Sequence, residues 1–78
     1  MELSELLAYL VEGLVDDPEA VTVDTFEERG TIVLELAVGT DDYGKVIGRG
    51  GRTAQALRRV IKAAGAASDQ RVLVDIVD

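Results

Sequence analysis

Apolar residues recur at helical spacing in two separate segments of the chain. In residues 2–15, and again in "RTAQALRRVIKAA" (52–64), they fall at intervals of three and four, which places them along one side of a helix. The first stripe consists of Leu3, Leu6, Leu7, Leu10, Val11 and Leu14, and the second of Thr53, Ala54, Leu57, Val60, Ile61 and Ala64. The pattern predicts two amphipathic helices, one stopped by Pro18 and the other by Gly65, with Leu57 and Ile61 in the core.

Three further segments have the character of strands, because they are rich in β-branched residues or alternate apolar and polar positions. They are "VTVDTF" (21–26), "TIVLELAV" (31–38) and "RVLVDIV" (71–77). The turn "EERG", with Gly30 available for a positive φ, predicts an antiparallel hairpin. A short helix is expected through "DYGKVI" (42–47), capped by Thr40 or Asp41. The order αββααβ predicts an α+β fold, a single domain over residues 1–78 with helices on one face of a three-stranded sheet.

The basic residues gather in one part of an acidic chain. The formal net charge is −7, yet Gly44 to Lys62 holds six of the eight Lys and Arg and none of the 15 Asp and Glu. A solvated surface on an acidic protein normally mixes both signs, so this segment predicts a cationic face for an anionic ligand. A domain of 78 residues also buries only about 60 to 65% of its unfolded surface, which favours a second copy as an added source of stability.

The composition removes several kinds of chemistry. The chain contains no Cys and no His, which excludes disulfides, thiolate or imidazole metal ligands and His-based catalytic triads. The acidic N-terminus and the lack of a long apolar run predict a cytoplasmic protein without a signal peptide or membrane span. The pairs Asp16–Asp17 and Asp41–Asp42 are interpreted as turn and cap residues rather than metal ligands. We therefore expect no enzyme activity, no cofactor and no metal site.

The segment "KVIGRGGRT" (45–53) places three glycines between two predicted helices. Glycine permits close backbone approach, and the first N–H groups of a helix lack internal partners, so this turn can present several donors to an anion. Two phosphate motifs fit poorly: a P-loop requires Ser or Thr where Val46 stands, and a dinucleotide fingerprint requires Gly where Thr53 stands. A tight corner between helices is the simpler structural alternative. The third phosphate motif, "IGRGG" (47–51), fits the GxxG loop with which KH domains clamp a nucleic-acid backbone.

The longer stretch "GKVIGRGGRTAQALRRVIKAA" (44–64) resembles the KH signature, in which an Ile-Gly-x-x-Gly loop joins two helices. Gly48 and Gly51 stand at its fixed glycines, and Ala54 and Leu57 at the apolar positions that follow. With the αββααβ order of the prokaryotic, type II fold, the whole chain is similar to the small bacterial single-KH proteins of the KhpA (YlqC) family. The resemblance implies single-stranded RNA, about four nucleotides long, in a groove between the loop and the sheet edge. It also implies a homodimer or pairing with a KhpB (Jag-type) KH protein.

Eight consecutive residues form the predicted RNA site. They are Lys45, Val46, Ile47, Gly48, Arg49, Gly50, Gly51 and Arg52. Residues 48–51 are expected to offer backbone N–H groups, and Lys45, Arg49 and Arg52 positive charge. Val46 and Ile47 are expected to wall the groove unless one of them belongs to the core. Two interpretations stay open for Arg58, Arg59 and Lys62: a second row of phosphate contacts, or side chains that are simply exposed to solvent.

Two functions follow from these patterns. The first is an RNA-binding protein of low sequence specificity, acting as a small post-transcriptional or ribosome-associated factor. Aromatic residues make up only 4% of the chain, so base stacking cannot be its main interaction. The second is a protein-interaction subunit in which RNA binding is secondary. The alanines at 54, 56, 63 and 64 either fit the second long helix against its own sheet or indicate that a dimer would form along it.

Overall fold

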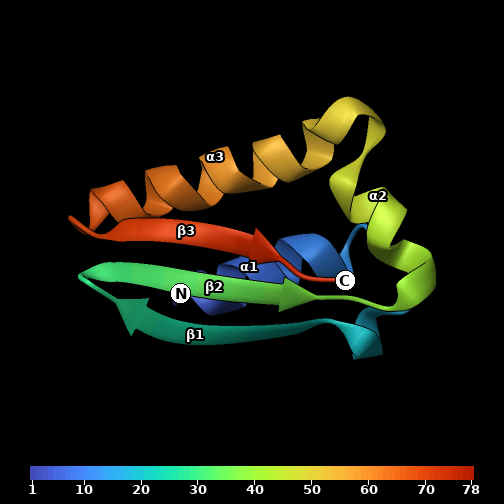
Figure 1. Cartoon of the computed structure of the whole chain (residues 1–78), viewed down its shortest axis with the longest axis horizontal. Helices are drawn as coiled ribbons and strands as arrows, with labels where there is room; N and C mark the ends of the chain where they lie inside the picture. The colour runs from blue at the N-terminus through green and yellow to red at the C-terminus, as the bar shows by residue number, and fades with distance from the viewer.

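The computed structural model describes all residues 1–78, and its elements follow the order αββααβ (Figure 1). The helices and strands are α1 (Leu3–Glu12), β1 (Thr22–Glu28), β2 (Thr31–Ala37), α2 (Tyr43–Ile47), α3 (Arg52–Ala67) and β3 (Arg71–Ile76). Single turns of 3₁₀ helix lie at Pro18–Ala20, Thr40–Asp42 and Arg49–Gly51. This arrangement confirms the predicted α+β fold class.

The three strands form one sheet in the order β1-β2-β3. β1 and β2 pair antiparallel, as the hairpin prediction required, whereas β3 lies parallel to β2. Parallel neighbours need a long crossover connection, which α2 and α3 provide. In Figure 1, α1 lies behind the sheet and α3 runs along β3. One edge of β3 and the front face of the sheet are therefore left without a covering element. None of the helices has the length and apolar character that a membrane crossing demands.

The hydrophobic core lies between the helices and one face of the sheet. Its fully or largely buried members are Leu7, Val11, Leu34, Leu36, Val46, Leu57, Ile61, Val72 and Val74. Leu57 and Ile61 thus have the core positions that the helical stripe predicted. Leu14 and Val60 belong to the same stripes but are 44% and 47% exposed. The stripe of apolar residues in the sequence therefore includes more positions than the folded protein buries.

Several helix boundaries differ from those predicted. α1 ends at Glu12, and α3 continues through Gly65, the predicted terminator, to Ala67. Gly65 is buried, and a Cβ at this position would lie 2.6 Å from Cγ2 of Val72. This glycine therefore permits close packing of α3 on β3 and does not end the helix. The predicted cap is also wrong, because Thr40 and Asp41 form a 3₁₀ turn and no side chain caps α2.

Candidate nucleic-acid interface

The glycine loop joins α2 to α3 through one 3₁₀ turn. Gly48, Gly50 and Gly51 all have positive φ, at 76°, 64° and 78°. Gly48 combines this φ with a ψ of 170°, a region that essentially only glycine occupies. A Cβ on Gly48 would also lie 2.2 Å from Oγ1 of Thr53, whereas one on Gly50 or Gly51 would meet no atom within 4 Å. Gly48 therefore fixes the path of the loop, and the space around Gly50 is open to a ligand.

The amides of this loop divide into those used inside the protein and those that are free. The N–H of Gly48 donates to the carbonyl of Gly44 at 2.9 Å, and that of Gly51 to the carbonyl of Gly48 at 3.1 Å. The N–H groups of Arg49 and Gly50 have no hydrogen-bond acceptor in the chain. Of the four amides expected to face a phosphate, two thus shape the loop and two are available.

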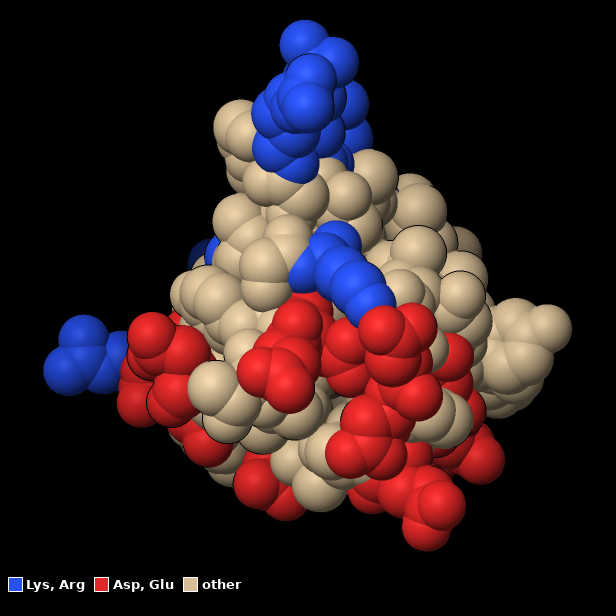
Figure 2. All heavy atoms as spheres, turned by 90° about the vertical axis from the view of Figure 1, so that its right-hand side faces the viewer, with Lys and Arg blue, Asp and Glu red and all other residues tan.

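Two cations stand beside the free amides. The side chains of Arg49 and Arg52 are exposed, and neither forms a salt bridge. Figure 2 shows Lys and Arg side chains projecting from the top of the molecule, above a lower half largely covered by Asp and Glu. An anion that approaches the loop therefore meets backbone donors and two unneutralised guanidinium groups together.

Lys45, the third predicted cation, has carboxylate partners instead. Its ammonium group pairs with the carboxylate of Asp16 and lies 3.4 Å from Oδ1 of Asp42. Asp42 is buried and accepts the N–H groups of Asp16 and Asp17 at 3.1 and 3.0 Å. The hydrogen bond from the Asp16 amide holds the pKa of Asp42 below its usual value, and the hydrogen bond to the Asp16 carboxylate raises the pKa of Lys45. These contacts tie α2 to the segment before β1, so the charge of Lys45 is largely neutralised.

The two apolar residues before the loop have different environments. Val46 is fully buried in the core cluster, which is the core role that the sequence had left open for one of the pair. Ile47 is half-buried and directly precedes the loop. Only Ile47 can therefore offer apolar surface to a ligand beside the glycines.

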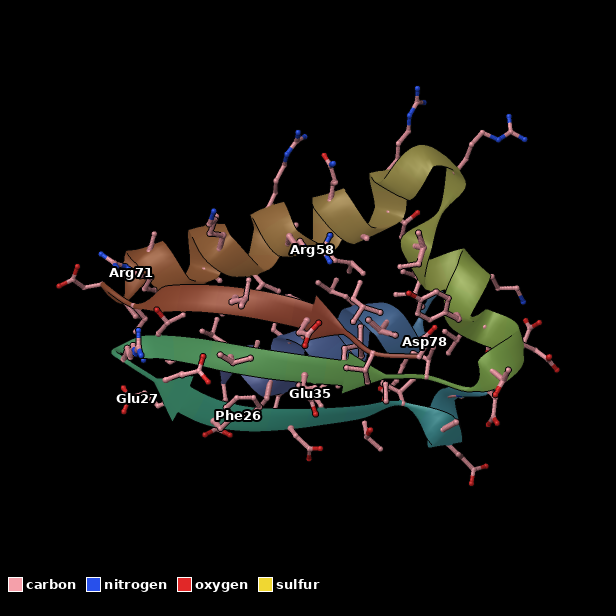
Figure 3. All side chains as sticks on the ribbon, in the orientation of Figure 1. Phe26, Glu27, Glu35, Arg58, Arg71 and Asp78 are labelled. Carbon is pink, nitrogen blue, oxygen red and sulfur yellow. The ribbon has the colours of Figure 1, made fainter.

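A groove of about 290 Å³ lies between α3 and the free edge of β3. It is lined by Gln55, Arg58, Arg59, Lys62, Val72, Leu73 and Val74. The Nε of Arg58, labelled in Figure 3, donates to the carbonyl of Val74 at 3.3 Å. The N–H of Val77 donates to the carbonyl of Leu36 on β2. Successive residues of a strand direct their main-chain N–H and C=O groups to opposite sides, so those of Val74 and Ile76 point away from β2. The groove thus has cationic side chains along one wall and backbone donors and acceptors along the other.

This groove extends the site beyond the predicted residues. Arg58, Arg59 and Lys62, which are all exposed, line it together. Gln55 was not predicted, and the sheet edge that the resemblance implied was not assigned to β3. The spacing of Gln55, Arg59 and Lys62 at i, i+4 and i+7 is a signal that could have found the helical wall. No local pattern reveals that β3 is an edge strand, because strand order depends on the whole topology.

The geometry of a helix, a glycine loop and a second helix beside a three-stranded sheet agrees with a family comparison. A model described as "KhpA/KhpB, KH domain" matches residues 4–76. The chain belongs to the KhpA/KhpB family of KH domains. It is 51% identical to the RNA-binding protein KhpA of Streptomyces coelicolor, over 97% of this chain and 92% of that one. It is 43% identical to the RNA-binding protein KhpA of Caldanaerobacter subterraneus subsp. tengcongensis, over 96% of this chain and 100% of that one.

Two solved structures of Era share this fold. An Aquifex aeolicus Era variant bound to GDP and AlF4− matches with a TM-score of 0.65 and 14% identity, over 95% of this chain and 29% of that one. A second Era structure, in complex with MgGDPNP and nucleotides 1506–1542 of 16S ribosomal RNA, also matches with a TM-score of 0.65 and 14% identity. The chain spans only 28% of this second Era chain. At this level of identity, the match shows a common fold for the KH domain and no more.

Proposed function

We propose that this KH domain binds single-stranded RNA, about four nucleotides at a time, at the GxxG loop and the adjoining groove. The observation that carries the proposal is the pair of free amides at Arg49 and Gly50, flanked by the unpaired side chains of Arg49 and Arg52. A phosphate can accept hydrogen bonds from both amides while the guanidinium groups neutralise its charge. The RNA-binding proteins KhpA that resemble the chain over nearly its full length support the same function.

The groove suggests how the nucleotides would lie. With a phosphate on the loop, the following bases would reach the edge of β3, where the N–H of Val74 and the main-chain groups of Ile76 point away from β2 and can meet base edges, while the carbonyl of Val74 already accepts from Arg58. A longer strand that continued along the groove would bring a further phosphate to Arg59 and Lys62 on the opposite wall. No aromatic side chain lines this groove, so bases would not be held by stacking on the protein. A site of about four nucleotides reads few bases, which supports low sequence specificity.

We infer a non-catalytic role for the protein, as a small post-transcriptional or ribosome-associated factor in the cytoplasm. The chain would act as one KH domain over residues 1–78, without a metal or a cofactor. The supporting observations are the family membership and the lack of any group of three His, Cys, Asp or Glu side chains that could hold a metal ion. A single four-nucleotide site gives weak, broad binding, which suits a factor that acts on many RNAs.

The chain offers a matched pair of variants to test the site. Arg49–Gly50 and Arg29–Gly30 are both Arg-Gly pairs in exposed turns, and both glycines have positive φ and enough open space that an added Cβ would meet no atom within 4 Å. Replacing Arg49 and Gly50 with Asp should weaken binding of short single-stranded RNA at least about tenfold, or 1.4 kcal/mol, because two carboxylates would meet the phosphate. The same replacement at Arg29 and Gly30 changes the net charge equally, at the opposite end of β2.

RNA titrations followed by NMR, with circular dichroism to verify the fold, would measure both variants. The proposal requires that the Arg49/Gly50 variant lose affinity while the Arg29/Gly30 variant retains it within about twofold. Equal losses in the two folded variants would mean that RNA responds only to total charge. An unchanged affinity in the Arg49/Gly50 variant would place the site elsewhere.

We also propose that α3 takes part in self-association, or in pairing with a KhpB-type KH protein. Of the four alanines that predicted this surface, Ala54 is buried in its own core, whereas Ala56 and Ala63 are exposed beside Val60. An apolar groove between α1 and α3 adjoins them, lined by Leu10, Leu14, Thr53, Ala56, Leu57 and Val60. A dimer there would leave the glycine loops open. Sedimentation equilibrium should show a mass above the 8.3 kDa monomer that falls on Ala63→Glu; a constant 8.3 kDa would contradict self-association.

A further inference from the structure

The face of the sheet that no helix covers carries an apolar row next to an acidic row. Phe26 on β1 is paired with Val33 on β2, which in turn is paired with Leu73 on β3. Side chains alternate between the two faces of a strand, so these three lie opposite the core residues Leu34 and Val74. We call the surface formed by Asp24, Phe26, Val33, Glu35, Leu73 and Asp75 the open sheet face. In Figure 3 it faces the viewer, with Phe26 and Glu35 labelled on neighbouring strands.

The apolar row forms a cluster separate from the core. Phe26 is 43% exposed and Leu73 is 53% exposed. Val33 between them is only 6% exposed, yet it does not belong to the core cluster. Its neighbours on the open sheet face therefore shield Val33, and their own outer surfaces contact water. Adjacent large apolar side chains on an otherwise polar surface are typical of a contact site.

The acidic row determines which partner fits. Asp24, Glu35 and Asp75 lie side by side across the three strands. Like charges directly opposite one another destabilise a sheet, and no cation neutralises these three, because the only salt bridges in the chain are those of Lys45. A ligand with positive charges would relieve this repulsion when it binds. RNA, which is anionic, would meet repulsion here.

We infer that the open sheet face binds a second protein through a segment that combines basic and apolar side chains. An apolar side chain of the partner would cover Phe26, Val33 and Leu73, and Lys or Arg residues would pair with the acidic row. Leu73 also borders the groove beside α3, whereas Phe26 and Asp24 lie on β1 at the other side of the sheet. The protein segment and the RNA would therefore occupy surfaces that meet only at Leu73 and would bind at the same time, which extends the proposed function to a link between RNA and a cationic protein.

The test uses the whole chain, labelled with ¹⁵N, and a short peptide that alternates lysine and leucine. We expect chemical-shift changes at the amides of the open sheet face and none at residues 48–51. Phe26→Ser should weaken binding at least about fivefold through loss of apolar contact, and Asp24→Lys should weaken it similarly. Glu12→Lys, an equal charge change on an exposed position of α1, should alter the affinity by less than about twofold. A peptide of lysine and serine should bind much more weakly.

Each other outcome contradicts the inference. Equal effects of Asp24→Lys and Glu12→Lys would mean that the peptide responds only to net charge. Full peptide affinity in a folded Phe26→Ser variant would show that the apolar side chain of Phe26 does not contribute to binding. Displacement of the peptide by RNA would mean that the two surfaces overlap. A sedimentation mass above 8.3 kDa that falls to the monomer on Phe26→Ser would make the open sheet face a contact between copies of this chain. RNA is added only in the displacement experiment. The peptide titrations of the unsubstituted chain and its variants contain no RNA, so their failure leaves the proposed RNA site unaffected.

Discussion

The α3 side of the molecule and the open sheet face differ in charge, in shape and in what holds them together. On the α3 side, unpaired cations surround a glycine loop and a groove, and no Asp or Glu occurs between Gly44 and Lys62. On the open sheet face, three carboxylates lie in a row beside exposed apolar side chains. The net charge of −7 describes neither surface. The charge of each surface therefore indicates what that surface can bind better than the net charge of the chain does.

The two surfaces also depend on different parts of the chain. The glycine loop is built from backbone conformation, and its free donors are main-chain N–H groups. The open sheet face is built from side chains on strands whose pairing holds whatever those side chains are. Replacing a glycine, which changes the backbone conformation, should therefore disrupt the first surface. The second surface should change only when its own side chains are replaced. The following predictions test this difference, beginning with the largest effect.

Gly48→Ala should cause the largest loss of stability. The φ and ψ of Gly48 lie in a region that costs other residues about 1–3 kcal/mol, and the added Cβ would overlap Thr53. We expect the free energy of unfolding, measured by urea denaturation, to fall by at least about 2 kcal/mol, together with loss of RNA binding. Peptide binding at the open sheet face should persist in the fraction that remains folded.

Gly50→Ala is the matched control, because Gly50 also has a positive φ but a Cβ there would contact no atom. Its cost should be limited to the left-handed backbone conformation, about 1–2 kcal/mol, and should be smaller than that of Gly48→Ala. If the two variants were equally stable, the contact with Thr53 would not constrain the loop. The difference between them thus measures the overlap with Thr53 together with the more restricted backbone conformation of Gly48.

Most of the fold follows from local patterns in the sequence. The helical stripes predicted α1 and α3, strand alternation predicted β2 and β3, and the turn at Gly30 predicted the hairpin. The prediction that Gly65 ends the helix was wrong, because a buried glycine within a helix and a glycine that ends one look alike in sequence. Only the contact with Val72 distinguishes the two. The cap predicted at Thr40 or Asp41 failed because the chain forms a 3₁₀ turn there.

The candidate site was located by its motif, but its details depend on tertiary structure. The sequence could not show that Lys45 pairs with Asp16, since the two residues are 29 positions apart. It could not decide whether Val46 or Ile47 is buried, because both precede the loop and both are β-branched and apolar. It could not place the edge of β3 beside α3, because that depends on the crossover. Local pattern therefore identifies the loop, and the topology adds the groove.

The different environments of Arg52 and Lys45 should appear in the salt dependence of RNA binding. If Arg49 and Arg52 each neutralise one phosphate, a plot of log affinity against log salt should have a slope of about −1.4. Arg52→Gln should reduce that slope by about 0.7 and weaken affinity about fivefold at moderate salt. Lys45→Gln should leave the slope unchanged, because its ammonium group already pairs with Asp16 and Asp42.

Fluorescence anisotropy with one labelled single-stranded RNA at several salt concentrations would give these slopes. A slope near about −2.8 in the unsubstituted chain would indicate four phosphate contacts and would bring Arg59 and Lys62 into the RNA site. If Lys45→Gln reduced the slope as much as Arg52→Gln does, Lys45 would have to leave Asp16 to contact RNA. The cationic surface would then be larger than Arg49 and Arg52 alone provide.

The smallest effect should be a pH dependence confined to the buried carboxylate of Asp42. Its pKa in the folded protein lies below the ordinary value of about 3.9, mainly because it accepts the N–H of Asp16. A group whose pKa is lowered by folding stabilises the fold above its unfolded pKa, and this contribution disappears as the pH falls through the folded pKa. The urea midpoint of the unsubstituted chain should therefore be level between about pH 7 and 5 and fall below about pH 4.

Asp42→Asn separates this contribution from that of the other carboxylates. The amide cannot ionise, so the variant should be less stable at neutral pH, and its urea midpoint should fall less between about pH 5 and 3 than that of the unsubstituted chain. Asp41→Asn, at the exposed neighbouring position, should keep the original acid dependence. An Asp42→Asn variant with that same acid dependence would show that the hydrogen bonds from Asp16 and Asp17 add no pH-dependent stability. Because these contacts lie at the start of α2 and the free amides lie beyond its end, RNA affinity at neutral pH should be the same in all three proteins.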